Sequence, residues 1–209
     1  MSAAGENGNY TGLLIDWGGV LTTSLFNSFA AFCEIEGLDP KTLADSFRHN
    51  PDARELLIGL ETGAIDEDEF EPALAAIIGV PAPGLIDRMF AGAGPDKVML
   101  TAVLAARRHG LKTGLISNSW GTRRYDREQL AQLFDGVVIS GEVGMRKPAP
   151  QMYTLGAERI GLAPERCVYV DDLEFNLAPA RELGMATVHH VDADHTVSEL
   201  ERLFGVRLR

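Results

Sequence analysis

Short apolar runs alternate with helical patterns in the second half of the chain. Residues 96–110 have apolar positions at helical spacing up to Gly110, and the strand-like run LKTGLIS follows directly. Further strand-like runs then alternate with helical patterns in VVIS, CVYV and ATVHH. Strands that alternate with helices predict a parallel sheet wound with helices, so the fold class is α/β.

One isolated strand pattern precedes this region. Residues 13–15 are Leu-Leu-Ile, an apolar run without alternation, which is typical of a parallel strand buried on both faces. The run has no strand-like neighbours nearby in sequence, so we expect it to join the later sheet. Residues 10–21 and 95–209 would then form one α/β core, preceded by a polar, flexible tail at residues 1–9.

The stretch between these parts contains helical patterns only. Apolar residues recur at helical spacing, as at Leu25, Phe29 and Phe32, which predicts an all-helical domain inserted at residues 22–94. The segment AGAGPDK at 91–97 has the glycines and proline of a linker or hinge.

One helix start within the insertion has two interpretations. Asp66 and Glu69 have the spacing of a capping box, which places the start at Asp66. Pro72 would then lie inside the helix and remove a hydrogen bond, which favours a start nearer to Pro72.

Composition narrows the range of partners. The chain has 30 acidic and 19 basic residues, a net charge of −11, which opposes general electrostatic binding to nucleic acid or an anionic membrane. No run of 18 apolar residues occurs, and the N-terminus lacks the basic start and apolar stretch of a secretory signal. Cys33 and Cys167 show no metal-type spacing, so a reduced cytoplasmic protein is expected.

Polar residues follow the predicted strands. Asp16, Gly18 and Gly19 follow the first, Ser117 and Asn118 end the second, and Asp171 and Asp172 follow CVYV. Lys147 precedes Pro148, which is predicted to begin a helix. The aspartates, glycines, Ser117 and Asn118 also suit ordinary turns or caps, and Lys147 also suits a solvated side chain. However, the carboxyl ends of parallel strands meet at one edge, where α/β sheets bind ligands. We therefore expect a reactive site there.

The three aspartates at this edge require a counter-charge. Asp16, Asp171 and Asp172 should repel and raise one another's pKa. Oxygen ligands of this kind suit Mg²⁺, and Lys147 adds a compact positive charge that can hold a phosphate.

Taken in order, IDWGGVLT, LISNS, GMRKPAP and VYVDDLEFNLAPA resemble the four motifs of the haloacid dehalogenase-like hydrolases. The resemblance covers nearly the whole chain. It implies a Rossmann-like core with a helical cap inserted after the first strand. Within the family, the chain resembles the sugar-phosphate phosphatase branches.

The resemblance also implies roles for individual residues. Asp16 matches the nucleophile that forms an aspartyl-phosphate, and Lys147 matches the motif lysine. Ser117 and the Asn118 N–H match the phosphate-binding group, to which the N–H groups of Gly18 and Gly19 can add. The implied metal ligands are Asp16, the Gly18 carbonyl, Asp171 and, above all, Asp172. Asn176 stands where a second acid is often found.

Gly18 departs from the family pattern. Phosphatases of this family usually have there an Asp that protonates the leaving group and later activates water. Without it, the departing oxygen must leave as an anion or take a proton from water, the substrate or a residue of the insertion.

These observations predict a Mg²⁺-dependent phosphatase of a small phosphorylated metabolite. Two alternatives stay open: a phosphate- or partner-binding protein that has lost turnover, and a dehalogenase, although dehalogenases usually lack the acidic pair. The oligomeric state is open too. Trp120, Arg123, Arg124 and Tyr125 either border the substrate entrance or form a solvated, basic helix start.

Overall fold

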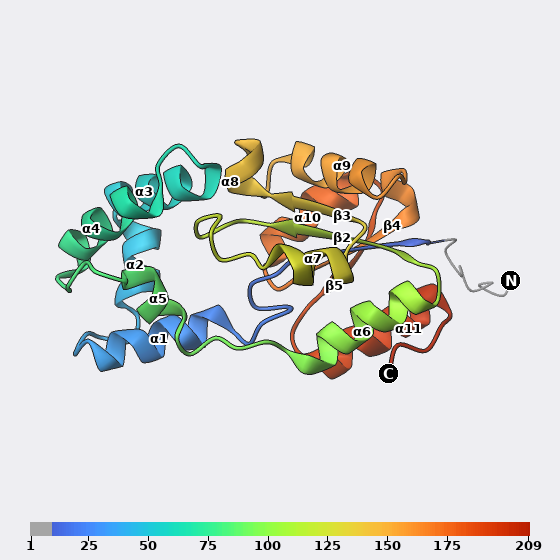
Figure 1. Cartoon of the computed structure of the whole chain (residues 1–209), viewed down its shortest axis with the longest axis horizontal. Helices are drawn as coiled ribbons and strands as arrows, with labels where there is room; N and C mark the ends of the chain where they lie inside the picture. Colours follow the sequence, from blue (N-terminus) through green and yellow to red (C-terminus); the bar gives the residue numbers. More distant parts are fainter. Residues whose placement is uncertain (1–9) are drawn as a thin grey trace, which may run out of the picture.

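Five parallel strands form one sheet in the order β3-β2-β1-β4-β5 (Figure 1). The computed structural model describes residues 10–209, so the tail predicted at residues 1–9 lies outside the described part of the chain. The strands are β1 (Gly12–Ile15), β2 (Lys112–Ser117), β3 (Gly136–Ile139), β4 (Cys167–Asp171) and β5 (Ala186–His189). The first strand thus pairs with β2 and β4, from distant parts of the sequence, as its apolar pattern predicts.

Helices cover both faces of this sheet, which confirms the predicted α/β fold class. The helices around the sheet are α6 (Lys97–Arg108), α7 (Arg127–Leu133), α8 (Ser140–Val143), α9 (Pro150–Arg159), α10 (Glu174–Glu182), α11 (Ala193–Phe204) and the 3₁₀ turn η1 (Pro164–Arg166). Leu13 and Ile15 of β1 belong to one buried cluster with α6, α7 and α11, whereas Leu14 belongs to a second cluster with α9 and α10. No helix within residues 10–209 is both long and apolar enough to cross a membrane.

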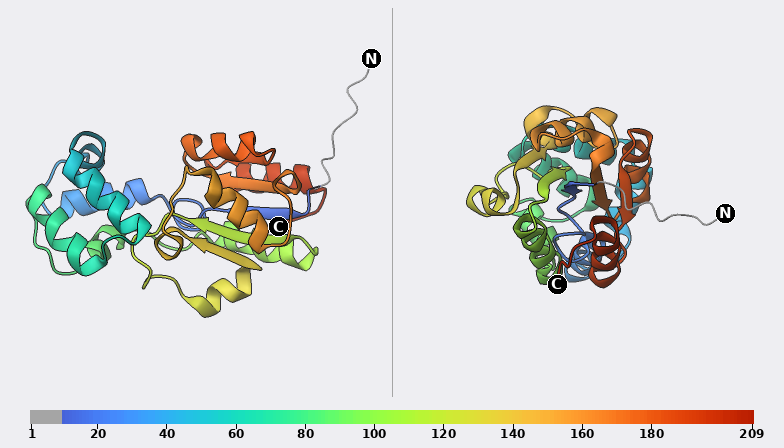
Figure 2. Two further views of the ribbon diagram at one scale, coloured as in Figure 1. Left: turned by 90° about the horizontal axis from the view of Figure 1, so that it is seen from above. Right: turned by 90° about the vertical axis from the view of Figure 1, so that its right-hand side faces the viewer.

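The remaining helices gather at one end of the molecule, beyond the carboxyl end of β1 (Figures 1 and 2). They share a buried apolar cluster of their own, which includes Phe32, Leu43, Phe70 and Leu74. These helices are α1 (Leu25–Ile35), α2 (Thr42–His49), α3 (Pro51–Thr62), α4 (Glu67–Ile78) and α5 (Leu85–Phe90). We call residues 22–94 the helical insertion.

The chain enters and leaves the helical insertion along two adjacent segments. Thr22 and Pro95 form an antiparallel bridge, and the Thr23 N–H donates to the Gly94 carbonyl at 2.8 Å. The Asp96 N–H donates to the Leu21 carbonyl at 2.9 Å. Both crossings therefore lie in one narrow connection.

The start of α4 lies at the capping box. The helix begins at Glu67, and the Asp66 side chain accepts from the Glu69 N–H at 2.9 Å, so the start near Pro72 is wrong. The helix tolerates Pro72 because Phe70 and Leu74 are buried in the apolar cluster of the insertion.

The expected helix start at Pro148 is also wrong. The Lys147–Pro148 bond is cis, and the chain turns there with the Ala149 N–H donating to the Arg146 carbonyl at 3.0 Å. α9 begins instead at Pro150, where a missing N–H costs no helical hydrogen bond.

Candidate active site

Adjacent strand ends bring the expected residues together at one edge of the sheet. Asp16 directly follows β1, Ser117 ends β2 and Asp171 ends β4. Since β1 lies between β2 and β4, these positions are neighbours. Carboxylate oxygens of Asp16, Asp171 and Asp172 lie within 4.8 Å of one another.

Lys147 is the central positive charge of this cluster. Its ammonium is almost fully buried and lies 2.8 Å from Asp16 Oδ1 and 2.7 Å from Asp171 Oδ2. Burial opposes the charged form, but the two carboxylates outweigh burial and raise the pKa of Lys147 above its usual value. Asn118 holds this part of the chain by donating to the Lys147 carbonyl at 3.1 Å and accepting from the Lys147 N–H at 2.8 Å.

The three aspartates titrate differently: the pKa values of Asp16 and Asp172 are raised, as expected, whereas the pKa of Asp171 is lowered. Burial raises the pKa of Asp16 to about 8, against the lowering effect of Lys147. Burial and the Asp171 charge raise the pKa of Asp172 to about 6. Burial acts on Asp171 as well, but Lys147 and hydrogen bonds from Tyr169 and Asn176 outweigh it and lower the pKa.

Hydrogen bonds and an ion pair also distinguish Asp171 from Asp172 as candidate metal ligands. Asp171 Oδ1 accepts from the Leu173 N–H and Asn176, and Oδ2 accepts from Tyr169, Asn176 and Lys147. Asp172 lines a cavity together with Asp16. An oxygen-only donor set of this kind fits Mg²⁺, so Asp16 and Asp172 would hold the ion.

We therefore expect Asp172→Ala to weaken Mg²⁺ binding by about 10-fold or more, since a direct carboxylate ligand is lost. Asp171→Ala should instead lower the melting temperature more than Asp172→Ala does, because Lys147 and Tyr169 lose their buried partner. Calorimetric Mg²⁺ titrations and thermal unfolding of both variants test this assignment. Equal Mg²⁺ affinities of the two variants would contradict it.

The glycine turn after Asp16 is shaped by its neighbours. Gly19 has a φ of 76°, and a Cβ there would lie 2.4 Å from Asp172 Oδ2, so only glycine fits without a shift. The sequence predicted that the Gly19 N–H binds phosphate, but this N–H instead donates to Thr22 Oγ1 at 3.0 Å. Gly18 does not have a positive φ, but a Cβ there would lie 2.6 Å from Leu25 Cδ1. Leu25 thus fills space beside Gly18, the position at which phosphatases of the resembled family usually have an aspartate.

Ser117 is paired with a residue from the following loop. Its Oγ lies 2.8 Å from the Tyr125 hydroxyl, and the Tyr125 ring packs edge-on against Trp17. Burial raises the pKa of Tyr125 well above its usual value, so the phenol stays protonated. The Ser117 hydroxyl is therefore oriented by Tyr125 at the edge where the predicted phosphate site lies.

The structure excludes one of the two interpretations of residues 120–125. A helix start is wrong, since α7 begins only at Arg127. Trp120 lines the cavity and contacts four aromatic rings of the helical insertion: Phe29, Phe47, Phe70 and Phe90. Arg123 lies 3.3 Å from Asp68, and Arg124 pairs with Asp87, so both connect the loop to the insertion.

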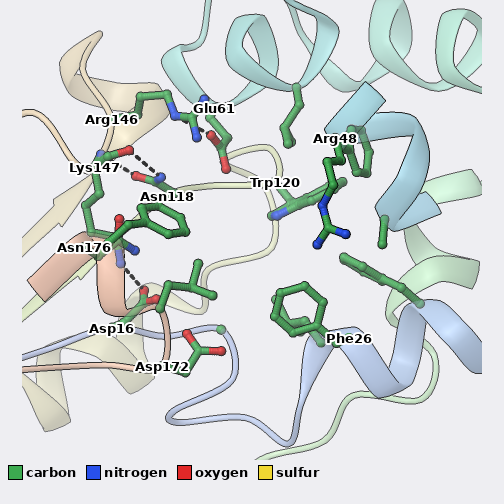
Figure 3. Close-up of a pocket in the computed structure, with 18 of the residues that line it drawn as sticks. Asp16, Phe26, Arg48, Glu61, Asn118, Trp120, Arg146, Lys147, Asp172 and Asn176 are labelled. Atoms are coloured by element: carbon green, nitrogen blue, oxygen red, sulfur yellow. Dashed lines mark hydrogen bonds and ion pairs between the residues drawn. The ribbon is translucent and has the colours of Figure 1, made fainter. Parts of the chain in front are cut away.

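A cavity of about 280 Å³ lies between the sheet edge and the helical insertion (Figure 3). Asp16, Asn118, Lys147 and Asp172 line its sheet side. Apolar side chains make up much of the remaining wall: Leu25, Phe26, Phe29, Phe47, Leu57, Trp120, Leu173 and Phe175.

Three charged residues at this cavity were not predicted from the sequence: Arg48, Glu61 and Arg146. Arg48 extends from α2 into the cavity, while Glu61 of α3 lies beside Arg146, with 2.7 Å between Glu61 Oε2 and Arg146 Nε (Figure 3). Glu61 is one of 30 acidic residues, and helical spacing does not tell which of them faces a site on another part of the chain. Arg146 could have been predicted, because it directly precedes the motif lysine, Lys147.

Comparison with known proteins identifies the family of the chain. The family model of the haloacid dehalogenase-like hydrolases matches residues 10–184, so the chain belongs to this family of hydrolases. The chain is similar to "Bifunctional epoxide hydrolase 2" of Sus scrofa, with 38% identity over 53% of this chain but only 21% of that protein. The chain thus spans about a fifth of the length of that relative.

Two further proteins resemble a larger part of the chain. A "Glyceraldehyde 3-phosphate phosphatase" of Methanopyrus kandleri is 28% identical, over 70% of this chain and 76% of that protein. A HAD family enzyme of Bacteroides thetaiotaomicron, solved in complex with magnesium and inorganic phosphate, superposes with a TM-score of 0.62. It is 23% identical and covers 86% of this chain and 93% of its own, a likeness that shows a shared fold.

Proposed function

We propose that this hydrolase is a Mg²⁺-dependent phosphatase that removes phosphate from a small organic phosphate ester. The observation that carries this proposal is the convergence of Asp16, Lys147 and Asp172 on one cavity. The alternative of a dehalogenase is less well supported, because carbon–halogen cleavage does not need an acidic pair such as Asp171 and Asp172.

In the proposed reaction, Asp16 attacks phosphorus and forms an aspartyl-phosphate as the bond to the alcohol oxygen breaks and the alcohol leaves. Water then hydrolyses the aspartyl-phosphate, which releases inorganic phosphate and restores Asp16. Lys147 holds a phosphate oxygen and offsets the charge of Asp16, while Ser117 and the Asn118 N–H hold other phosphate oxygens. Mg²⁺, held by Asp16, Asp172 and the Gly18 carbonyl, would neutralise part of the charge on the phosphate.

We further propose that the helical insertion acts as a cap and closes over the substrate. The narrow connection at Thr22 and Pro95 provides a pivot, and the insertion contributes much of the cavity wall opposite the phosphate site. A closed cap would exclude water from the reacting groups.

The apolar wall supports an ester whose alcohol part is itself apolar. Phe26 and Phe175, each 57% exposed, line the cavity and would lose contact with water when such a group binds. We therefore expect kcat/KM to rise from ethyl to hexyl phosphate by about 10- to 100-fold, since each buried CH₂ contributes about 0.8 kcal/mol when fully enclosed. Steady-state assays of phosphate release measure this series, in which the acidity of the leaving alcohol stays nearly constant.

Two outcomes would count against these proposals separately. A flat series, or a preference for glycerol 3-phosphate over hexyl phosphate, would contradict the apolar substrate class alone. Absence of Mg²⁺-dependent phosphate release from every ester would instead favour the binding-protein alternative, to which the Leu25 contact at Gly18 gives some support.

A further inference from the structure

Glu61 is a buried carboxyl that the proposed function leaves without a role. It belongs to α3 of the helical insertion and is only 5% exposed. It is held in place twice, since its main-chain carbonyl accepts from the Ser140 hydroxyl and its Oε2 pairs with Arg146. Within the described residues, Oε2 is buried and has this ion pair but no hydrogen-bond partner.

The position of Glu61 relative to Asp16 suits a proton donor. Both residues line the same cavity, and Figure 3 shows Glu61 on its α3 side, beside Arg146, with Asp16 at the sheet edge. Phosphoryl transfer places the attacking and the leaving oxygens roughly in line, on opposite sides of phosphorus. The leaving oxygen of an ester that Asp16 attacks therefore faces away from the sheet, towards the wall that Glu61 belongs to.

We propose that Glu61 replaces the acid that is absent at position 18, an inference that rests on the phosphatase activity proposed above. As the bond from Asp16 Oδ to phosphorus forms and the bond to the leaving oxygen breaks, the Glu61 carboxyl gives its proton to that oxygen. In the second step, the Glu61 carboxylate takes a proton from the water that attacks the aspartyl-phosphate, and the starting state is restored.

The surroundings of Glu61 favour the protonation state that this role requires. Burial raises the pKa of Glu61 to about 7, although Arg146 and Lys147 act in the opposite direction. A donor with a pKa near neutrality is partly protonated at working pH and can give up its proton readily. The charged and titratable groups around it are Arg146, Lys147, Tyr125, Arg48 and, across the cavity, Asp16 and Asp172.

The test compares esters that need a proton on the leaving oxygen with esters that do not. For Glu61→Gln, we expect kcat/KM with hexyl phosphate to fall by about 100-fold or more, the usual contribution of a general acid. The loss with 4-nitrophenyl phosphate should be much smaller, because nitrophenolate leaves without protonation. The dependence of kcat/KM on leaving-group pKa should thus be steeper in Glu61→Gln than in the wild type.

Arg146→Met is the matched control, because it breaks the same ion pair and keeps the carboxyl. It should keep the leaving-group dependence of the wild type. Since Arg146 lowers the pKa of Glu61, its removal should move the high-pH decline of kcat/KM to higher pH. Circular dichroism and thermal unfolding of both variants show whether they are folded.

Each result of this experiment decides the proposal. Equal losses with alkyl and aryl esters in Glu61→Gln, or the same steepening in Arg146→Met, would mean that Glu61 has only a structural role. In both cases the phosphatase function would stand. A wild-type protein without Mg²⁺-dependent turnover of any ester would overturn both proposals.

Discussion

Asp16→Asn is expected to lower kcat by about 10⁴-fold or more, since removal of a nucleophile that forms a covalent intermediate has effects of this size. The amide has nearly the shape of the carboxylate, and Lys147 keeps its second carboxylate, Asp171, at 2.7 Å. The fold should therefore persist, and circular dichroism can verify this. Phosphate release under single-turnover conditions measures the loss.

The Asp16→Glu variant tests whether Asp16 acts as a nucleophile or supplies only a negative charge. Glutamate keeps the carboxylate but moves it by about one bond length, and a misplacement of about 1 Å can cost about 10²-fold in a reaction that depends on alignment. We expect this variant to be nearly inactive too. Acid quenching of wild-type protein during turnover, followed by mass spectrometry, should find one phosphoryl group on the peptide that contains Asp16. Substantial activity of Asp16→Glu together with an unmodified peptide would rule out the covalent mechanism.

Lys147→Met should affect stability as well as turnover. The substitution leaves Asp16 and Asp171 buried without their shared counter-charge, and breaking a buried ion pair in this way costs about 3–5 kcal/mol of unfolding free energy. Loss of the positive charge at the phosphate site should lower kcat by about 10²- to 10³-fold. Lys112→Met is the control, since Lys112 is 54% exposed and lies 3.7 Å from Asp135, a surface pair that contributes about 1 kcal/mol or less.

The stability loss in Lys147→Met should depend on pH in a defined direction. Lys147 lowers the pKa of Asp16 and Asp171, so its removal raises both values in the folded state. Carboxyls with a raised folded-state pKa favour folding at low pH and lose that contribution as pH rises through the raised pKa. The deficit relative to wild type should thus shrink when pH is lowered from about 8 to about 5. Denaturant unfolding at a series of pH values, without Mg²⁺, tests this; a deficit that grows on acidification would contradict it.

Mg²⁺ provides a second readout for the same variant. An ion bound near Asp16 and Asp172 would supply part of the positive charge that Lys147→Met removes, and it stabilises only the folded state. We expect Mg²⁺ to raise the melting temperature of Lys147→Met more than that of the wild type. An equal shift in both proteins would indicate that the ion does not interact with the carboxylates that Lys147 neutralises.

The fold class and most of the sheet edge follow from the amino-acid sequence alone. Buried parallel strands require continuous apolar runs, so residues 13–15 and the later strands are visible in the pattern of side chains. Because parallel strands end at a common edge, the same pattern predicts that Asp16, Ser117 and Asp171 lie together, and they do. The ordered set of motifs added the family, which the family model confirms.

The surroundings of these residues depend on tertiary contacts. Whether Asp171 or Asp172 carries uncompensated charge depends on Lys147, Tyr169 and Asn176, which converge on Asp171. In the same way, the Gly19 N–H is taken by Thr22. Hydrogen bonds of this kind depend on side-chain directions, which hydrophobic periodicity does not encode.

The helical insertion shows most clearly which features the sequence predicts and which depend on tertiary contacts. Its periodicity predicts helices because each helix must bury an apolar face, and Phe32 and Phe70 do lie in the core of the insertion. The direction of Glu61 and Arg48 follows from how α2 and α3 pack against the sheet edge, through Trp120 and Arg146. That packing joins residues far apart in the chain, so the groups that face Asp16 across the cavity become visible only in the folded protein.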